Sequence, residues 1–203
     1  MALRDAVLTA LLDGESSGYD LAKGFDASVA NYWMATPQQL YRELDRLAEE
    51  GLIRARVVHQ ERRPNKRIYS LTRAGRDAIE SFTAQPPKAS MIRGELLVKV
   101  QAVDAGDAAA VREFVADSVR RANAKLEHYE RLRSRLLDGR SEEKYLATTE
   151  RLGPYLTLLR GISFEQENIR WAEHALGVIE RRMRRPNSPP YLDAAAGAAT
   201  PLG

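Results

Sequence analysis

Cysteine is absent from the sequence, and histidine is scarce, with three residues in a chain of 203. Without cysteine the chain can form no disulfide framework, no thiolate zinc site and no thiol nucleophile. His59, His128 and His174 fall on separate predicted elements, and no two of them have the spacing of a metal-binding motif. Glycine-rich phosphate loops and the GxSxG nucleophile motif are also missing. We therefore expect no catalytic residues, no bound metal and no cofactor.

Long apolar runs are also missing. The longest stretch without a charged residue, 27–41, has 15 residues and includes Asn31 and Gln38, whereas a membrane-spanning helix needs about 20 mostly apolar residues. The first 15 residues mix Arg4, Asp5 and Asp13 into their apolar positions, unlike the clean apolar core of a secretory signal. We expect a soluble, cytoplasmic protein with no membrane partner.

Positive charge is concentrated in one short segment. The whole chain is nearly balanced, with a net charge of +3, but residues 54–67 hold six basic residues and one acidic residue, a net charge of +5 in 14 residues. A basic hairpin suits the phosphates or the minor groove of DNA. The alternative is a solvated edge hairpin whose charges only prevent aggregation.

Proline marks two breaks in the chain. Pro86 and Pro87 are adjacent, which stops a helix, and the last 18 residues are rich in proline, alanine and glycine without periodicity. These breaks predict a first unit over 1–84, a linker over 85–90, a second unit over 91–185 and a flexible tail over 186–203.

The first unit is predicted to contain three helices, a two-stranded hairpin and a fourth helix. The third helix has the clearest start, because Thr36 precedes Pro37 and Gln39 follows at the third helical position, the pattern of a capping box. Gly51 ends this helix. Alternating β-branched and aromatic residues on either side of a Pro-Asn turn then predict the hairpin. This order is typical of a helix-turn-helix followed by a wing.

The third helix presents polar side chains away from its leucines. Gln38, Tyr41 and Arg42 are expected on this face, and Asp45 and Arg46 can extend it. Glutamine and arginine can bond to base edges in a major groove. The alternative is an ordinary amphipathic helix whose polar face contacts only water. Together, helix and basic wing favour DNA binding.

The second unit is predicted to be all-helical. Its apolar residues repeat at three and four residues along long segments, which favours coiled-coil-like pairing with a second copy, although the helices could instead close on themselves or on the first unit. Gly153 and Gly161 are expected to interrupt or kink the last segment. The residues expected at a dimer interface are Val115, Val119, Leu126, Tyr129, Leu152, Leu156, Leu159, Trp171, Leu176 and Ile179.

Four motifs in the first unit resemble the PadR family of bacterial transcriptional regulators. They are SGYDL, PQQLY, EEGLI and the YSLT-x-AG that leaves the wing, and the resemblance covers residues 5–82. In the second unit, MIRGELLVKV and RGISFEQENIRWAEHAL are similar to the helical domain found behind some PadR winged helices, including the virulence-activator type.

The resemblance implies a dimeric winged-helix regulator, usually a repressor, with two tyrosines at the DNA surface and a wing that grips the duplex. Its partners would be double-stranded operator DNA and a second copy of itself. Because some relatives also bind planar aromatic molecules, a small-molecule effector of unknown identity is a third possible partner. The resemblance and the pattern of the third helix together give the expected DNA-binding residues: Tyr19, Thr36, Pro37, Gln38, Gln39, Tyr41, Arg42, Arg46, Arg62, Arg63, Asn65, Lys66 and Arg67.

The expected fold is therefore mainly α with a small β-hairpin: a winged helix-turn-helix domain followed by an all-helical dimerisation domain. The expected function is sequence-specific DNA binding in transcription regulation. The alternative is a winged-helix adaptor that binds proteins and not specific DNA, because winged helices also serve as interaction modules.

Overall fold

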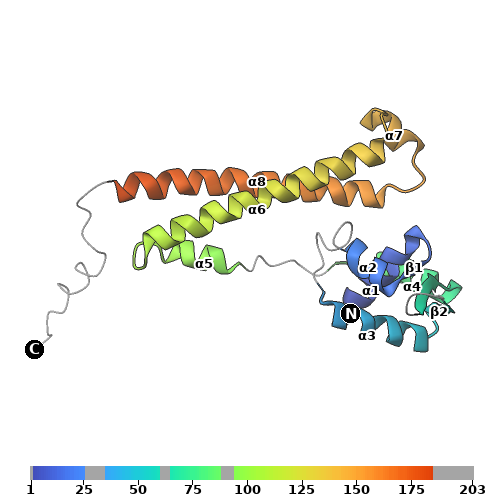
Figure 1. Cartoon of the computed structure of the whole chain (residues 1–203). Helices are drawn as coiled ribbons and strands as arrows, with labels where there is room; N and C mark the ends of the chain where they lie inside the picture. The colour runs from blue at the N-terminus through green and yellow to red at the C-terminus, as the bar shows by residue number, and fades with distance from the viewer. Residues whose placement is uncertain (1, 26–34, 60–64, 88–93, 185–203) are drawn as a thin grey trace, which may run out of the picture. The chain divides into compact units, whose positions relative to one another are not determined.

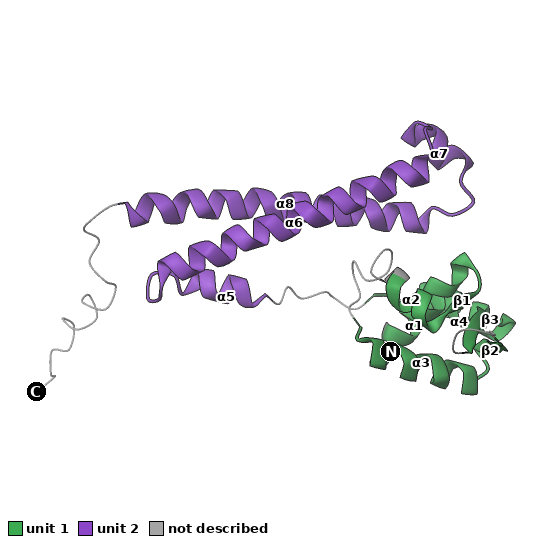
Figure 2. Ribbon diagram, in the orientation of Figure 1, with its two compact units in different colours: residues 1–89 green, residues 90–203 purple. Residues whose placement is uncertain are grey.

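In the computed structural model the chain divides into two compact units, residues 1–89 and 90–203 (Figure 2). The structure describes residues 2–25, 35–59, 65–87 and 94–184. The boundary between the units falls within the predicted linker, 85–90. The predicted tail and the wing tip, 60–64, lie outside the described residues. Within the described part, no helix has both the length and the apolar character needed to span a bilayer.

The first unit is a winged helix-turn-helix, as the sequence predicted (Figure 1). The predicted hairpin is present as two antiparallel strands, and a third strand of two residues, which the sequence analysis missed, completes the sheet in the order β1-β3-β2. In the register of β1, Ser16 faces Tyr69 and Ser17 faces Ile68. The elements are α1 (Ala2–Ala10), a 3₁₀ turn (Leu11–Asp13), β1 (Ser16–Ser17), α2 (Gly18–Phe25), α3 (Pro37–Glu49), β2 (Ile53–Val58), β3 (Lys66–Leu71) and α4 (Arg73–Thr83).

The third helix begins and ends where its sequence indicates. Thr36 Oγ1 accepts a hydrogen bond from Gln39 N at 3.2 Å, and Thr36 N donates to Gln39 Oε1 at 2.9 Å, so the predicted capping box is present. Gly51 follows the helix with φ of 71°, a backbone conformation that favours glycine. The three α3 leucines are at most 2% exposed and lie in one core with residues of α1, α2 and the sheet: Val7, Leu8, Leu11, Leu21, Leu40, Leu44, Leu47, Leu52, Ile53 and Tyr69.

A close backbone contact joins α4 to the segment after α3. Thr72 Oγ1 caps α4 by accepting from Gly75 N at 3.1 Å, and it donates to the carbonyls of Gly51 and Leu52. A Cβ atom at Gly75 would lie 2.1 Å from the carbonyl oxygen of Leu52. Glycine is therefore required for α4 to lie this close to the core.

The described part of the second unit is all-helical, as its periodicity led us to expect, and contains α5 (Glu95–Gln101), α6 (Ala108–Leu137), α7 (Glu142–Thr148) and α8 (Gly153–Met183). Val111 and Val115, near the start of α6, pack with Ile179 near the end of α8. Tyr129, near the end of α6, packs with Ile162 in the first half of α8. The two helices, each about 45 Å long, therefore pack antiparallel (Figure 1).

Two details of the second unit differ from the sequence prediction. Helix α7 was not predicted; Ser141 starts it by accepting from Lys144 N at 3.2 Å. Helix α8 is continuous through Gly161, where an interruption was expected. A Cβ atom at Gly161 would lie 3.2 Å from the ring of Tyr129, so this glycine lets α6 approach α8 closely and does not break the helix.

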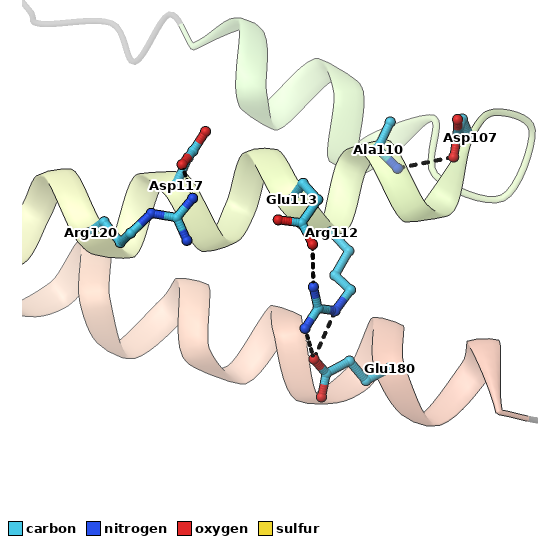
Figure 3. Close-up of polar contacts among 7 residues, drawn as sticks. All are labelled: Asp107, Ala110, Arg112, Glu113, Asp117, Arg120 and Glu180. Atoms are coloured by element: carbon cyan, nitrogen blue, oxygen red, sulfur yellow. Dashed lines mark hydrogen bonds and ion pairs between the residues drawn. The ribbon is translucent and has the colours of Figure 1, made fainter.

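Polar side chains also connect α6 to α8. The guanidinium of Arg112 reaches from α6 to Glu180 of α8, with its Nη2 atom 2.6 Å from Glu180 Oε1 (Figure 3). Nearer the middle, Glu165 is 4% exposed and accepts from Asn168 at 3.0 Å, with Lys125 Nζ at 3.4 Å. Burial, and then the nearby charge of Glu165, raise the pKa of Tyr129 above its ordinary value.

We expect Gly75→Ala to destabilise the first unit, because the added methyl group would meet the Leu52 carbonyl and force the backbone apart. Overpacking of this kind costs about 1–3 kcal/mol, measurable as a lower thermal midpoint. Gly153→Ala is the matched control, because its added Cβ would have no atom within 4 Å apart from its chain neighbours and the backbone of its own helix. Equal midpoints for Gly75→Ala and the wild type would contradict the contact.

Candidate functional site

A groove of about 790 Å³ lies on the first unit where α2, α3 and the base of the wing meet. It brings together five of the residues expected to bind DNA: Tyr19, Tyr41, Asn65, Lys66 and Arg67. The same groove is lined by Ser17, Gly18, Asp20, Asp45 and the buried Tyr69. Residues that are far apart in sequence thus form one surface.

The two expected tyrosines are both accessible in this groove. Tyr19, in the first turn of α2, is 68% exposed, and Tyr41, on α3, is 43% exposed. The ring of Tyr41 lies against the backbone of Gly18, because a Cβ atom there would be 2.5 Å from Tyr41 Cε1. Glycine at position 18 therefore sets how closely α3 and its tyrosine approach the start of α2.

The cations at the base of the wing are paired with carboxylates from the helices. Lys66 Nζ lies 2.8 Å from Asp20 Oδ2, and Arg67 Nη1 lies 3.0 Å from Asp45 Oδ1. On β2, Arg56 Nη2 lies 3.1 Å from Glu15 Oε2. The segment that the sequence marks as strongly basic is thus partly neutralised by acidic residues outside it.

Asp20 also orders the start of α2. Its backbone N–H donates to Ser17 Oγ at 3.0 Å, and the hydroxyl of Ser17 donates to Asp20 Oδ2 at 2.6 Å. The backbone bond makes Ser17 the N-cap of α2. The hydrogen bonds from Lys66 and from Ser17 lower the pKa of Asp20. Its carboxylate is therefore charged at neutral pH.

The expected DNA-binding residues of α3 differ in whether their side chains already have partners within the chain. In the described part of the chain, the exposed side chains of Gln38 and Arg42 make no hydrogen bond or ion pair. Gln39 is exposed, but its amide oxygen belongs to the capping box, and Pro37 is at the first helical position. Arg46 lies outside the groove, in ion pairs with Glu43 and Glu50. Gln38 and Arg42 are thus free to bind a partner.

Two expected wing residues, Arg62 and Arg63, lie outside the described residues. The sequence analysis placed Asp45 only on the polar face of the third helix, and it assigned no role to Gly18 or Asp20. Gly18 and Asp20 belong to the SGYDL motif, and this motif was the sequence feature that could have pointed to them. An acidic side chain is not by itself a sign of DNA binding. Among the described residues, no group of three His, Cys, Asp or Glu side chains is placed to hold a metal ion.

The expected dimer residues fall into two groups. Most of them pack between α6 and α8 of the same chain: Val115, Val119, Leu126, Tyr129, Trp171, Leu176 and Ile179. Leu159 is half-buried, and Leu152 and Leu156 are 46% and 54% exposed. The seam therefore packs within one chain, and Leu152 and Leu156 remain exposed outside it.

Comparison with known proteins agrees with this architecture. Residues 7–81 match the PadR-like family of transcriptional regulators, and residues 92–180 match the family described as virulence activator alpha C-term. A probable transcriptional regulator of Mycobacterium tuberculosis is 31% identical over 90% of this chain and 100% of its own length.

Two solved structures share the fold. Bacillus subtilis PadR in complex with operator DNA is 26% identical, with a TM-score of 0.70 over 88% of this chain and 99% of that chain. The Vibrio cholerae virulence activator AphA is 28% identical, with a TM-score of 0.63 over 89% of this chain and 99% of that chain. Since the Mycobacterium relative matches almost the whole chain and the winged helix matches the family directly, the chain belongs to the PadR-like family of transcriptional regulators.

Proposed function

We propose that this regulator binds a specific operator sequence as a homodimer and represses transcription there. The observation that carries the proposal is the groove in which two exposed tyrosines, the polar face of α3 and the base of the basic wing converge. The Bacillus subtilis relative is named a negative transcriptional regulator and has been solved with operator DNA, which supports the same role here.

In this proposal α3 enters the major groove. Because its leucines are buried, the opposite face of α3 points to the surface, and Gln38, Tyr41 and Arg42 are exposed there. Arginine bonds to the N7 and O6 acceptors of guanine and glutamine to adenine, so Gln38 and Arg42, which have no partner in the described part of the chain, supply the base contacts. Thr36, Pro37 and Gln39 form the N-terminus of α3, where backbone N–H groups suit a phosphate.

The wing would hold the DNA backbone. Asn65, Lys66 and Arg67 line the groove beside α3, and Arg62 and Arg63 follow from the sequence at the wing tip. Cations at such positions neutralise phosphates and release condensed counterions, which strengthens binding to any duplex. Arg46, held by two glutamates, is at most an outer phosphate contact.

The helical unit would supply the dimer. Two winged helices must be about 34–36 Å apart to read successive major grooves on one face of DNA, and helices α6 and α8 are long enough to act as the spacer. Leu152 and Leu156 are four residues apart at the start of α8 and are exposed, so burying them against a second copy would remove apolar surface from water.

A small-molecule effector is part of the proposal by analogy with a relative. Bacillus subtilis PadR has also been solved in complex with p-coumaric acid. If a compound of this class regulates the present protein, adding p-coumaric acid will raise its thermal midpoint and weaken its operator binding; no change in either quantity would remove this class of effector.

The direct test is a titration of the full-length protein onto duplex DNA from upstream of its own gene and onto a scrambled duplex, at two salt concentrations. A DNA-binding regulator should prefer the upstream duplex and lose affinity steeply as salt rises. A protein-binding adaptor would show weak and equal affinity for both duplexes.

Arg42→Ala and Lys66→Ala are expected to have different effects. Removing a base contact should cost about 1–3 kcal/mol of operator binding and reduce sequence preference, while removing a phosphate contact should weaken all duplexes and reduce the salt slope by about one. Fluorescence anisotropy with the two duplexes measures both effects. An equal loss on operator and scrambled DNA in both variants would refute this division of roles.

Gly18→Ala should weaken operator binding without unfolding the protein. The added methyl group displaces the Tyr41 ring, which we expect to cost about 1 kcal/mol, the worth of one hydrogen bond. Alanine also favours a helix over glycine, so the thermal midpoint should stay the same or rise. Unchanged operator affinity would show that the position of Tyr41 is not used in binding.

Leu156→Glu should dissociate the dimer. In the dimer the leucine would be buried against the second copy, which is worth about 1.5–3 kcal/mol, and the glutamate would place an unpaired charge there. Sedimentation velocity measures the change from dimer to monomer. Gln166→Glu, on an exposed position of the same helix, is the charge-matched control. A dimeric Leu156→Glu variant would place the interface elsewhere.

A further inference from the structure

The groove contains two carboxylates that a DNA-binding surface would be expected to avoid. Asp20 and Asp45 both line it, and each holds one wing cation, at 2.8 Å for Lys66 and at 3.0 Å for Arg67. The two acids come from different helices, and their partners are neighbours on β3. The arrangement therefore occurs twice, side by side, on the surface proposed to meet DNA.

An internal carboxylate changes what a cation contributes to binding. A free lysine or arginine gains affinity when it neutralises a phosphate and releases a counterion from the DNA. A cation that is already paired must first leave its carboxylate, or must bring that negative charge close to the phosphates. Exposed ion pairs are weak, and the side chains of all four residues are at least 39% exposed, so phosphate can displace the carboxylates but gains less by doing so.

The cost of releasing the cations is the same on random and on cognate DNA, so it favours a cognate site only where base recognition offers the released carboxylate another bond. Binding to random sequence depends almost wholly on phosphate contacts, whereas a cognate site adds base contacts from Gln38 and Arg42. Asp45 lies one turn beyond Tyr41 and Arg42 on α3 and is exposed. Once Arg67 turns to a phosphate, the carboxylate of Asp45 is free to accept from the amino group of a cytosine, a contact that only a matching sequence provides.

We propose that Asp20 and Asp45 are specificity-determining residues that compete with DNA phosphates for Lys66 and Arg67, and so keep the protein from binding random sequence. The proposal rests on the proposed operator binding. In this proposal the wing cations make their full contacts with the DNA phosphates only when α3 binds its matching bases.

The test compares Asp20→Asn and Asp45→Asn in the full-length protein with wild type on a scrambled duplex over a range of salt. Each variant should bind the scrambled duplex roughly three- to tenfold more tightly, with a steeper salt dependence, and the preference for the upstream duplex should fall. Asp77→Asn is the control, because it removes the same charge from an exposed position of α4 outside the groove; it should change binding much less.

Charge-conserving variants separate competition from a purely structural role. Asp20→Glu and Asp45→Glu should bind scrambled DNA nearly as weakly as wild type. Thermal unfolding checks the fold, and Asp45→Asn decides the matter if Asp20→Asn loosens the start of α2, because Asp45 does not cap a helix.

The proposal is overturned if both asparagine variants bind scrambled DNA no more tightly than wild type, or if Asp77→Asn strengthens binding equally. Either result would mean that the ion pairs only attach the wing to the helices, and operator binding by the wild type would remain intact. Failure of the wild type to bind either duplex in a salt-dependent manner would overturn the proposed function, and this proposal with it.

Discussion

The burial of one face of α3 is the constraint on which the rest of the proposed DNA-binding surface depends. Leu40, Leu44 and Leu47 are almost fully buried against α1, α2 and the sheet, and this fixes the rotation of the helix about its axis. Because the rotation is fixed, Tyr41 must face the groove, and Arg42 must remain exposed. The capping box fixes where the helix begins, so the residues available to DNA are set by apolar packing on the opposite face.

The second consequence is electrostatic. The wing is joined to the rest of the first unit by pairing of β3 with β1 and by three ion pairs among the described residues, two of them in the groove. The charge that the sequence concentrates in residues 54–67 therefore does not appear on the surface as one uniform patch. The number of basic residues therefore overstates the field that DNA would meet. Affinity for the DNA backbone and selectivity for a base sequence then depend on different side chains that lie next to one another.

Local signals made much of the fold predictable. The Thr36-Pro37 start, the leucine face of α3 and the hairpin each depend on residues close in sequence, and each is present. The missed features are short or non-local: strand β1 has two residues, helix α7 has seven, and Asp20 and Lys66 are separated by 46 positions. The helical seam was ambiguous for a similar reason, because an apolar repeat shows that Val115 needs a partner without showing that α8 of the same chain provides it.

The central claim is that two copies of this chain place two α3 helices in successive major grooves of an operator. Hydroxyl-radical footprinting of the full-length protein on DNA from upstream of its gene tests this claim most directly. The account predicts two protected patches on one face of the duplex, about 10–10.5 base pairs apart or a multiple of that spacing. A single protected patch, or uniform weak protection along the whole fragment, would contradict it.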